Sequence, residues 1–94
     1  MTEQEFHDLM YVWSKETEYV SSTEKICEHY AFRQLIEAGK SIVPYIHYML
    51  AANENRLLLM LVLCEIFGFS PVKEENQGMI ADMTKDWLEY LQGN

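Results

Sequence analysis

The chain has 94 residues, of which 49% are hydrophobic and 23% charged, and its formal net charge is −8. A chain of this length forms one domain, so we expect residues 1–94 to fold as a single unit. The excess of acidic side chains argues against direct binding of free nucleic acid or of an anionic membrane, because both require a basic surface. Residues 1–28 carry seven acids and two bases, residues 29–68 carry three of each, and residues 69–94 carry five acids and two bases. An apolar, neutral middle is therefore flanked by two acidic ends.

The N-terminal sequence MTEQEFHDLM is acidic and lacks the apolar stretch of an export signal. The longest unbroken apolar run, Leu57 to Cys64, has eight residues, whereas a membrane span needs roughly 20. The two cysteines, Cys27 and Cys64, are too few for a disulfide framework. We therefore expect a cytoplasmic protein with reduced thiols and no membrane contact.

Helical spacing of apolar side chains predicts the elements of the first half of the chain. Thr2 and Glu5 have the spacing of a capping box, in which each side chain bonds the backbone N–H of the other residue. Ser21 and Glu24 repeat that spacing and predict a second helix start. The expected helices cover residues 3–19, 23–30 and 32–38, with a break near residues 29–31.

Glycine, proline and asparagine divide the second half of the chain. Gly39 suits a left-handed residue that ends a helix. Ser41 suits the cap of the next helix, and Pro44 then lies in its first turn, where a missing N–H does no harm. Asn53 or Asn55 suits the cap of the helix that follows. The expected helices end near residue 51 and at residue 68, and a last helix covers residues 79–91.

These elements predict an all-α fold, a compact bundle of five to six short helices, because no segment has the alternating pattern of a strand. Residues 35–68, LIEAGKSIVPYIHYMLAANENRLLLMLVLCEIFG, resemble a HEAT-like repeat, which pairs a G-x-x-(A/V)-(V/L)-P-x-L helix start with a second apolar helix ending in glycine. The matching positions are Gly39, Val43, Pro44 and Ile46 in the first helix, and Arg56, Leu63, Ile66 and Gly68 in the second.

Short motifs across most of the chain resemble a group of small bacterial all-helical proteins of unknown function. The chain departs from that group at Tyr30, where a histidine-proline pair is expected nearby, and at residues 59–61, which are aliphatic instead of aromatic. The resemblance implies an all-α fold with one HEAT-like repeat at its centre, and it supplies no catalytic residue. The matching residues are Trp13, Thr17, Ser21, Ser22, Gly39, Pro44, Gly68, Pro71, Val72, Trp87 and Leu88.

Candidate metal ligands are single and scattered, whereas a structural zinc site usually shows paired ligands. On a helix, Cys27 and His29 would point about 200° apart. No phosphate-binding loop or catalytic triad signature is present, and the cysteines are expected to be small core residues. We therefore expect no metal, no cofactor and no enzyme activity. The scattered candidates are Cys27, His29, Cys64, His7 and His47.

The helices on either side of residue 53 have more apolar faces than a small domain can cover. Leu58 and Leu61 share a stripe with Glu54 and Glu65, which predicts that this stripe points outward. Because large exposed apolar patches mark interfaces, we predict a non-catalytic protein-interaction module or small regulatory adaptor. It would bind a protein partner or form a homodimer. The expected contact residues are Tyr45, Tyr48, Met49, Leu58 and Leu61.

The acidic ends predict an alternative function. A small, acidic, helical protein could be a phage-type inhibitor of a bacterial defence protein that occupies a nucleic-acid-binding surface. Binding through charge would weaken steeply with ionic strength, whereas binding through an apolar surface would change little. Asp82 and Asp86 are expected on the solvated side of the last helix. The charges of this acidic surface would be Glu3, Asp8, Glu16, Glu18, Asp82, Asp86 and Glu89.

Overall fold

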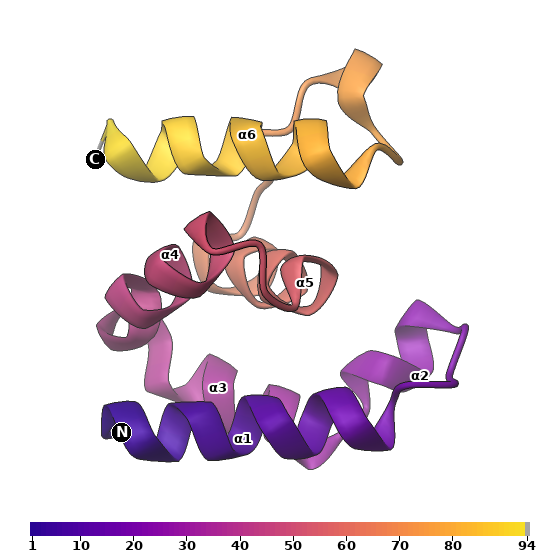
Figure 1. Cartoon of the computed structure of the whole chain (residues 1–94), viewed down its shortest axis with the longest axis vertical. Coiled ribbons are helices and arrows are strands. Elements are labelled where there is room, and N and C mark those ends of the chain that lie inside the picture. The colour runs from indigo at the N-terminus through magenta and orange to yellow at the C-terminus, as the bar shows by residue number, and fades with distance from the viewer. Residues whose placement is uncertain (94) are drawn as a thin grey trace. The chain divides into compact units, whose positions relative to one another are not determined.

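The fold is built from helices. A computed structural model describes residues 1–93 (Figure 1). Within those residues no β-strand occurs, and the all-α prediction is confirmed. In the same range, no helix combines the length and apolar character that a bilayer crossing requires. The α-helices are α1 (Glu3–Glu16), α2 (Thr23–Cys27), α3 (Tyr30–Ala38), α4 (Val43–Ala51), α5 (Arg56–Phe67) and α6 (Ile80–Gln92), and the 3₁₀ turns are η1 (Gly39–Ile42) and η2 (Glu74–Asn76).

Backbone contacts divide the chain into two compact units, Met1–Tyr45 and Ile46–Asn94. The first unit contains α1, α2, α3 and η1, and the second contains α5, η2 and α6. The helix α4 begins in the first unit and continues into the second. The expectation of one domain over residues 1–94 stays a prediction.

The helix α1 begins at the predicted capping box. The Thr2 hydroxyl accepts the Glu5 N–H at 3.1 Å, and the Glu5 carboxylate accepts the Thr2 N–H at 3.0 Å. Phe6, Met10 and Trp13 are buried along one side of the helix. Burial of each such side chain contributes about 1.5–3 kcal/mol. This stripe, more than intrinsic helix propensity, therefore holds α1 in place.

The end of α1 is set by Thr17, earlier than the predicted end at residue 19. The Thr17 backbone N–H donates to the Trp13 carbonyl at 3.0 Å, and the Thr17 hydroxyl donates to the same oxygen at 2.6 Å. Threonine side chains compete in this way for helical acceptors. Thr17 leaves the helical region at φ −109° and ψ 9°, so the extension to residue 19 was wrong.

The helix α2 starts at Thr23 as predicted, but its cap is Ser22 and not Ser21. The Ser22 hydroxyl accepts the Lys25 N–H at 3.4 Å. The predicted break follows, and α3 starts at Tyr30, two residues earlier than expected. The helix α3 packs along α1 (Figure 1), and it buries Leu35 completely.

Gly39 has φ +65° and ψ −146°, a conformation that costs little only for glycine. Its φ is positive, as the predicted left-handed residue requires, but its ψ lies outside the left-handed helical region. The Ser41 hydroxyl donates to the Ala38 carbonyl at 2.8 Å, so it closes the end of α3. Its predicted role as cap of the next helix was wrong. Pro44 is the second residue of α4, where its missing N–H removes no helical bond.

The connection to α5 contains two asparagines with positive φ, Asn53 at 61° and Asn55 at 47°. Asn55 is the cap residue of α5, as one of the two predicted alternatives, but its side chain makes no cap hydrogen bond. The helix ends as predicted at Gly68, which is left-handed and donates its N–H to the Cys64 carbonyl at 2.9 Å. Both ends of α5 therefore rest on left-handed backbone.

The core of the second unit lies where α5 packs against α6 (Figure 1). Trp87 of α6 is fully buried, and its ring centroid lies 6.0 Å from those of Phe67 and Tyr90. Phe69 contacts the Tyr90 ring edge to face at 5.2 Å. The buried side chains that α5 supplies are Leu59, Met60, Val62 and Leu63.

Candidate functional site

The predicted partner surface is only partly exposed on α4. Tyr48 faces solvent, whereas Tyr45 is half-buried with its ring centroid 5.6 Å from that of Phe6. Met49 is 5% exposed. Residues three apart on a helix share one side, and Ile46 on that side is fully buried. The expectation of Met49 as a surface contact was therefore wrong.

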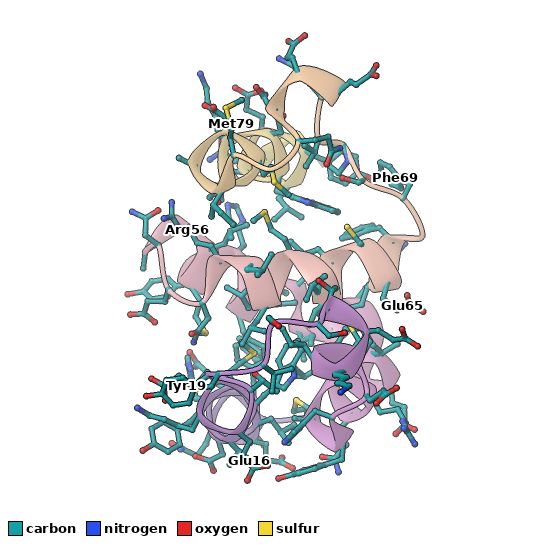
Figure 2. All side chains as sticks on the ribbon, turned by 90° about the vertical axis from the view of Figure 1, so that its right-hand side faces the viewer. Glu16, Tyr19, Arg56, Glu65, Phe69 and Met79 are labelled. Atoms are coloured by element: carbon teal, nitrogen blue, oxygen red, sulfur yellow. The ribbon has the colours of Figure 1, made fainter. Side chains whose placement is uncertain are left out.

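The predicted outward stripe of α5 is also less exposed than expected. Glu65 is exposed, and Figure 2 shows it toward the opposite end of α5 from Arg56. Leu58 and Leu61, which lie between Arg56 and Glu65 in the helix, are half-buried. Leu57, which the sequence pattern did not single out, is the exposed leucine of this helix. Solvent therefore reaches the apolar side chains of α5 mainly at Leu57.

Three exposed tyrosines were not singled out by the sequence pattern. Tyr11, Tyr19 and Tyr30 are between 51% and 93% exposed. The position of Tyr11 could have been found from spacing, because it falls outside the buried stripe of α1. Figure 2 labels Tyr19 of the first unit. It also labels Phe69 and Met79, two exposed apolar side chains of the second unit.

The predicted acidic surface is largely exposed, with two exceptions. Asp82 is half-buried, and Asp86 is 5% exposed. The placement of Asp86 on the solvated side of α6 was therefore wrong. The exposed members are Glu3, Asp8, Glu16, Glu18 and Glu89.

Asp86 is buried because it holds the turn that precedes α6. Its Oδ2 accepts the side-chain N–H of Asn76 at 2.8 Å and the backbone N–H of Lys73 at 3.0 Å. These bonds stabilise the ionised carboxylate and lower the pKa of Asp86 below its usual value, with the bond from Asn76 contributing most. The carboxylate is thus a structural acceptor for η2. Helical spacing could not separate Asp86 from Asp82, since only the fold brings the turn over one of them.

Two of the exposed acids on α1 have partners within the same helix. The Glu3 carboxylate lies 3.6 Å from His7 Nε2, and the Gln4 side-chain N–H donates to Asp8 Oδ1 at 2.9 Å. Exposed pairs of this kind contribute little to stability. Their carboxylates remain accessible to another molecule.

The His29 ring makes a hydrogen bond through each of its two nitrogens. Its Nδ1 accepts the backbone N–H of Ala31 at 3.1 Å, so the ring is the cap of α3. Its Nε2 lies 2.6 Å from Glu16 Oε1, and the His29 side chain is 12% exposed. A ring that accepts at Nδ1 carries its proton on Nε2 and donates it to Glu16. Both ring nitrogens are therefore engaged, and neither is left to act as a base toward Cys27.

The cysteines are less buried than the predicted core role requires. Both Cys27 and Cys64 are half-buried. Burial raises the pKa of the Cys64 thiol, which outweighs the opposing hydrogen bond with Ser70, and the nearby Glu65 charge raises it further. Because the thiolate is the reactive form, Cys64 is a poor nucleophile at neutral pH.

Across residues 1–93, no three histidine, cysteine, aspartate or glutamate side chains gather as a metal ion requires. Among the candidate polar residues, Glu16 and His29 are bonded to each other in the first unit. In the second unit, Asp86 is bonded to the Asn76 side chain and to the Lys73 backbone. The resemblance to HEAT-like repeats and to small bacterial helical proteins stays a prediction. Comparison with protein families, curated proteins and solved structures finds no match to this chain.

Proposed function

We propose that the chain is a non-catalytic protein-interaction module, acting in the cytoplasm as a small adaptor. It binds a protein partner, or a second copy of itself, through α4 and α5. The observation that carries the proposal is the exposure of Tyr48 on α4 and of Leu57 on α5, together with the half-buried Leu58 and Leu61 of α5. These four residues are here called the α4–α5 surface.

The composition of the α4–α5 surface supports this proposal. Tyrosine combines a large apolar ring with a polar hydroxyl, and it is enriched at the centres of protein interfaces. The half-buried leucines of α5 add apolar area without a large cost in ordering side chains. The connection between the two helices supplies exposed polar groups, from Asn53 to Asn55, which suit the rim of such an interface.

The structural use of the polar side chains supports a non-catalytic role. Both ring nitrogens of His29 are bonded, and the Asp86 carboxylate already accepts two donors. The raised pKa of Cys64 keeps that residue in its unreactive thiol form. Within residues 1–93, the groups with shifted pKa values are Glu5, which caps α1, Asp86, which holds a turn, and the half-buried Cys64.

The experiment measures self-association and partner capture with matched variants. Light scattering gives the oligomeric state over a wide concentration range for the native chain, Tyr48→Asp, Leu57→Asp and the control Tyr19→Asp. The same four proteins serve as baits in extracts of the source cells, with quantitative mass spectrometry. We expect a dimer, or a captured protein, that Tyr48→Asp and Leu57→Asp lose and Tyr19→Asp keeps.

A native chain that stays monomeric and captures nothing sensitive to Tyr48 or Leu57 would contradict the proposal. Circular dichroism shows whether each variant remains helical. Leu57 is preferred to Leu61 as a test position because Leu61 is half-buried, so a charge there would also disturb packing.

A second candidate function is the acidic inhibitor of a nucleic-acid-binding defence protein. The observation that favours it is the excess of acids in both units, eight against four bases in Met1–Tyr45 and seven against three in Ile46–Asn94. The five exposed acids named above would form the acidic binding surface, and the buried Asp86 would not belong to it. Added salt separates the two functions, because a captured partner held by charge is released and one held by the α4–α5 surface stays bound.

A further inference from the structure

His29 links two elements of the first unit with one ring. On one side, its Nδ1 satisfies the Ala31 N–H, one of the amides at the start of α3 that no helical carbonyl can reach. On the other side, its Nε2 is bonded to Glu16 in the last turn of α1. The segment between them, residues 17–28, is held a second time by the buried bond from Trp13 Nε1 to the Ile26 carbonyl at 2.9 Å.

The two bonds of His29 respond in opposite ways to an added proton. Protonation places a hydrogen on Nδ1, which can then no longer accept the Ala31 N–H. A cation at the start of α3 is also disfavoured by the helix dipole. The bond to Glu16 is strengthened instead, because it becomes a charge-assisted bond between an imidazolium and a carboxylate.

The groups near the ring come from α1, α3 and the end of α2. From α1, the charged group bonded to it is Glu16. From α3, the Tyr30 ring stacks on it with centroids 4.6 Å apart and an interplanar angle of 29°. From the end of α2, Cys27 and the exposed Glu28 precede it in the chain. Imidazole is the side chain that ordinarily changes its charge near neutral pH.

We infer that His29 is a proton-sensitive latch: on protonation the ring stays with Glu16, releases the Ala31 N–H and loosens the junction between residues 17–28 and α3. This segment contains Tyr19, the most exposed of the tyrosines. A mildly acidic environment would therefore change how the first unit presents that side chain. The device is independent of the α4–α5 surface and of the function proposed for it.

The test is nuclear magnetic resonance on the full chain between about pH 8 and pH 5, the range in which histidines titrate. Long-range ¹H–¹⁵N spectra of the His29 ring are expected to show the Nε2–H form at the upper end. Solvent exchange of the Ala31 amide, corrected for intrinsic rates, is expected to speed up about fivefold to tenfold on acidification, as suits the loss of one cap. The Glu5 amide, capped by Thr2, serves as an internal reference that stays unchanged.

Two variants separate the latch from general acid effects. His29→Asn keeps a cap acceptor that does not titrate, so the Ala31 amide should stay protected across the range. His7→Asn removes a different histidine and should leave the response as in the native chain. A proton on Nδ1 at the upper pH, an Ala31 amide that does not respond, or a response that persists in His29→Asn would each overturn the inference. The native spectra decide the question even if a variant fails to fold.

Discussion

The two tryptophans of this chain are both fully buried, one in each unit, and they are held in different ways. Trp13 donates its indole N–H to the Ile26 carbonyl at 2.9 Å, and its ring lies 5.5 Å from that of Phe32. Trp87 packs among aromatic rings, and its indole N–H finds no acceptor anywhere in residues 1–93. The first unit thus adds a directional bond to packing, whereas the second relies on packing around its tryptophan.

Two side chains that are equally buried can therefore contribute differently to the free energy of folding. A buried donor that is bonded adds about 0.5–1.5 kcal/mol, while an unpaired one costs about 1–3 kcal/mol. The hydrogen bond of Trp13 therefore fixes the position of α2 relative to α1. Trp87 contributes a large apolar ring but carries the cost of its unpaired N–H.

The largest expected effect comes from changing each tryptophan to phenylalanine. Both changes remove similar volume, so the cavity terms nearly cancel in the comparison. Trp13→Phe also loses a hydrogen bond, whereas Trp87→Phe also removes an unpaired donor. We expect Trp13→Phe to be less stable than Trp87→Phe by about 2 kcal/mol in urea unfolding followed by circular dichroism. Equal losses, or a larger loss for Trp87→Phe, would show that the unpaired N–H is satisfied in solution.

A smaller effect is expected at the helix starts that the two units build differently. In the first unit, the Thr2 side chain caps α1 directly, and Thr2→Ala should lower the free energy of unfolding by about 1 kcal/mol. In the second unit, Asn55 starts α5 with a positive φ and no side-chain cap bond. Asn55→Gly should therefore change stability by less than about 0.5 kcal/mol, since glycine adopts this backbone freely. Thermal and urea unfolding give both values, and the weaker 3.4 Å cap of Ser22 offers an intermediate case through Ser22→Ala.

The smallest effect at neutral pH is expected for Asp86→Asn, which keeps an oxygen acceptor for the turn but removes the charge. The folded pKa of Asp86 lies below its unfolded value, so its ionised form stabilises the fold at neutral pH. That contribution is lost as the pH falls below about 4, where the unfolded carboxyl takes up a proton, and on through the lowered folded pKa.

Unfolding measured between about pH 7 and pH 2.5 tests the direction of this pH dependence. The interval spans the ordinary aspartate pKa of about 3.9. The native chain should lose its advantage over Asp86→Asn on acidification. Within residues 1–93, the half-buried Asp82 accepts no bond of this kind, so Asp82→Asn should keep the acid dependence of the native chain. An advantage that persists at the acid end would mean that Asp86 is not the responsive group.

Sequence reasoning found most helices but misplaced several of their ends. The capping box at Thr2 and the glycine stop at Gly68 were correct, because each depends on groups within one or two turns of the chain. The end of α1 and the cap of α4 were missed, because Thr17 and Ser41 donate their hydroxyl groups to carbonyls of the preceding turn. A hydroxyl can accept or donate, and its spacing in the sequence does not say which it does.

The candidate site was less predictable than the helices. Tyr48 was correctly placed at the surface, while Met49 is buried beside Ile46 and the exposed Leu57 was overlooked. The apolar helices α4 and α5 have no polar face to fix their rotation, so periodicity could not say which side turns inward. That choice depends on which neighbours the helices find.

The all-α class, the approximate helices and the acidic character of both units can be predicted without a structure, since they follow from composition and from spacing within a few turns. Which polar groups are structural depends on the folded arrangement of the chain. The bonds from Trp13 to Ile26, between His29 and Glu16, and from Lys73 to Asp86 each join residues 13 positions apart. No helical or strand period encodes such a separation, because the path of the turns in between sets which atoms meet.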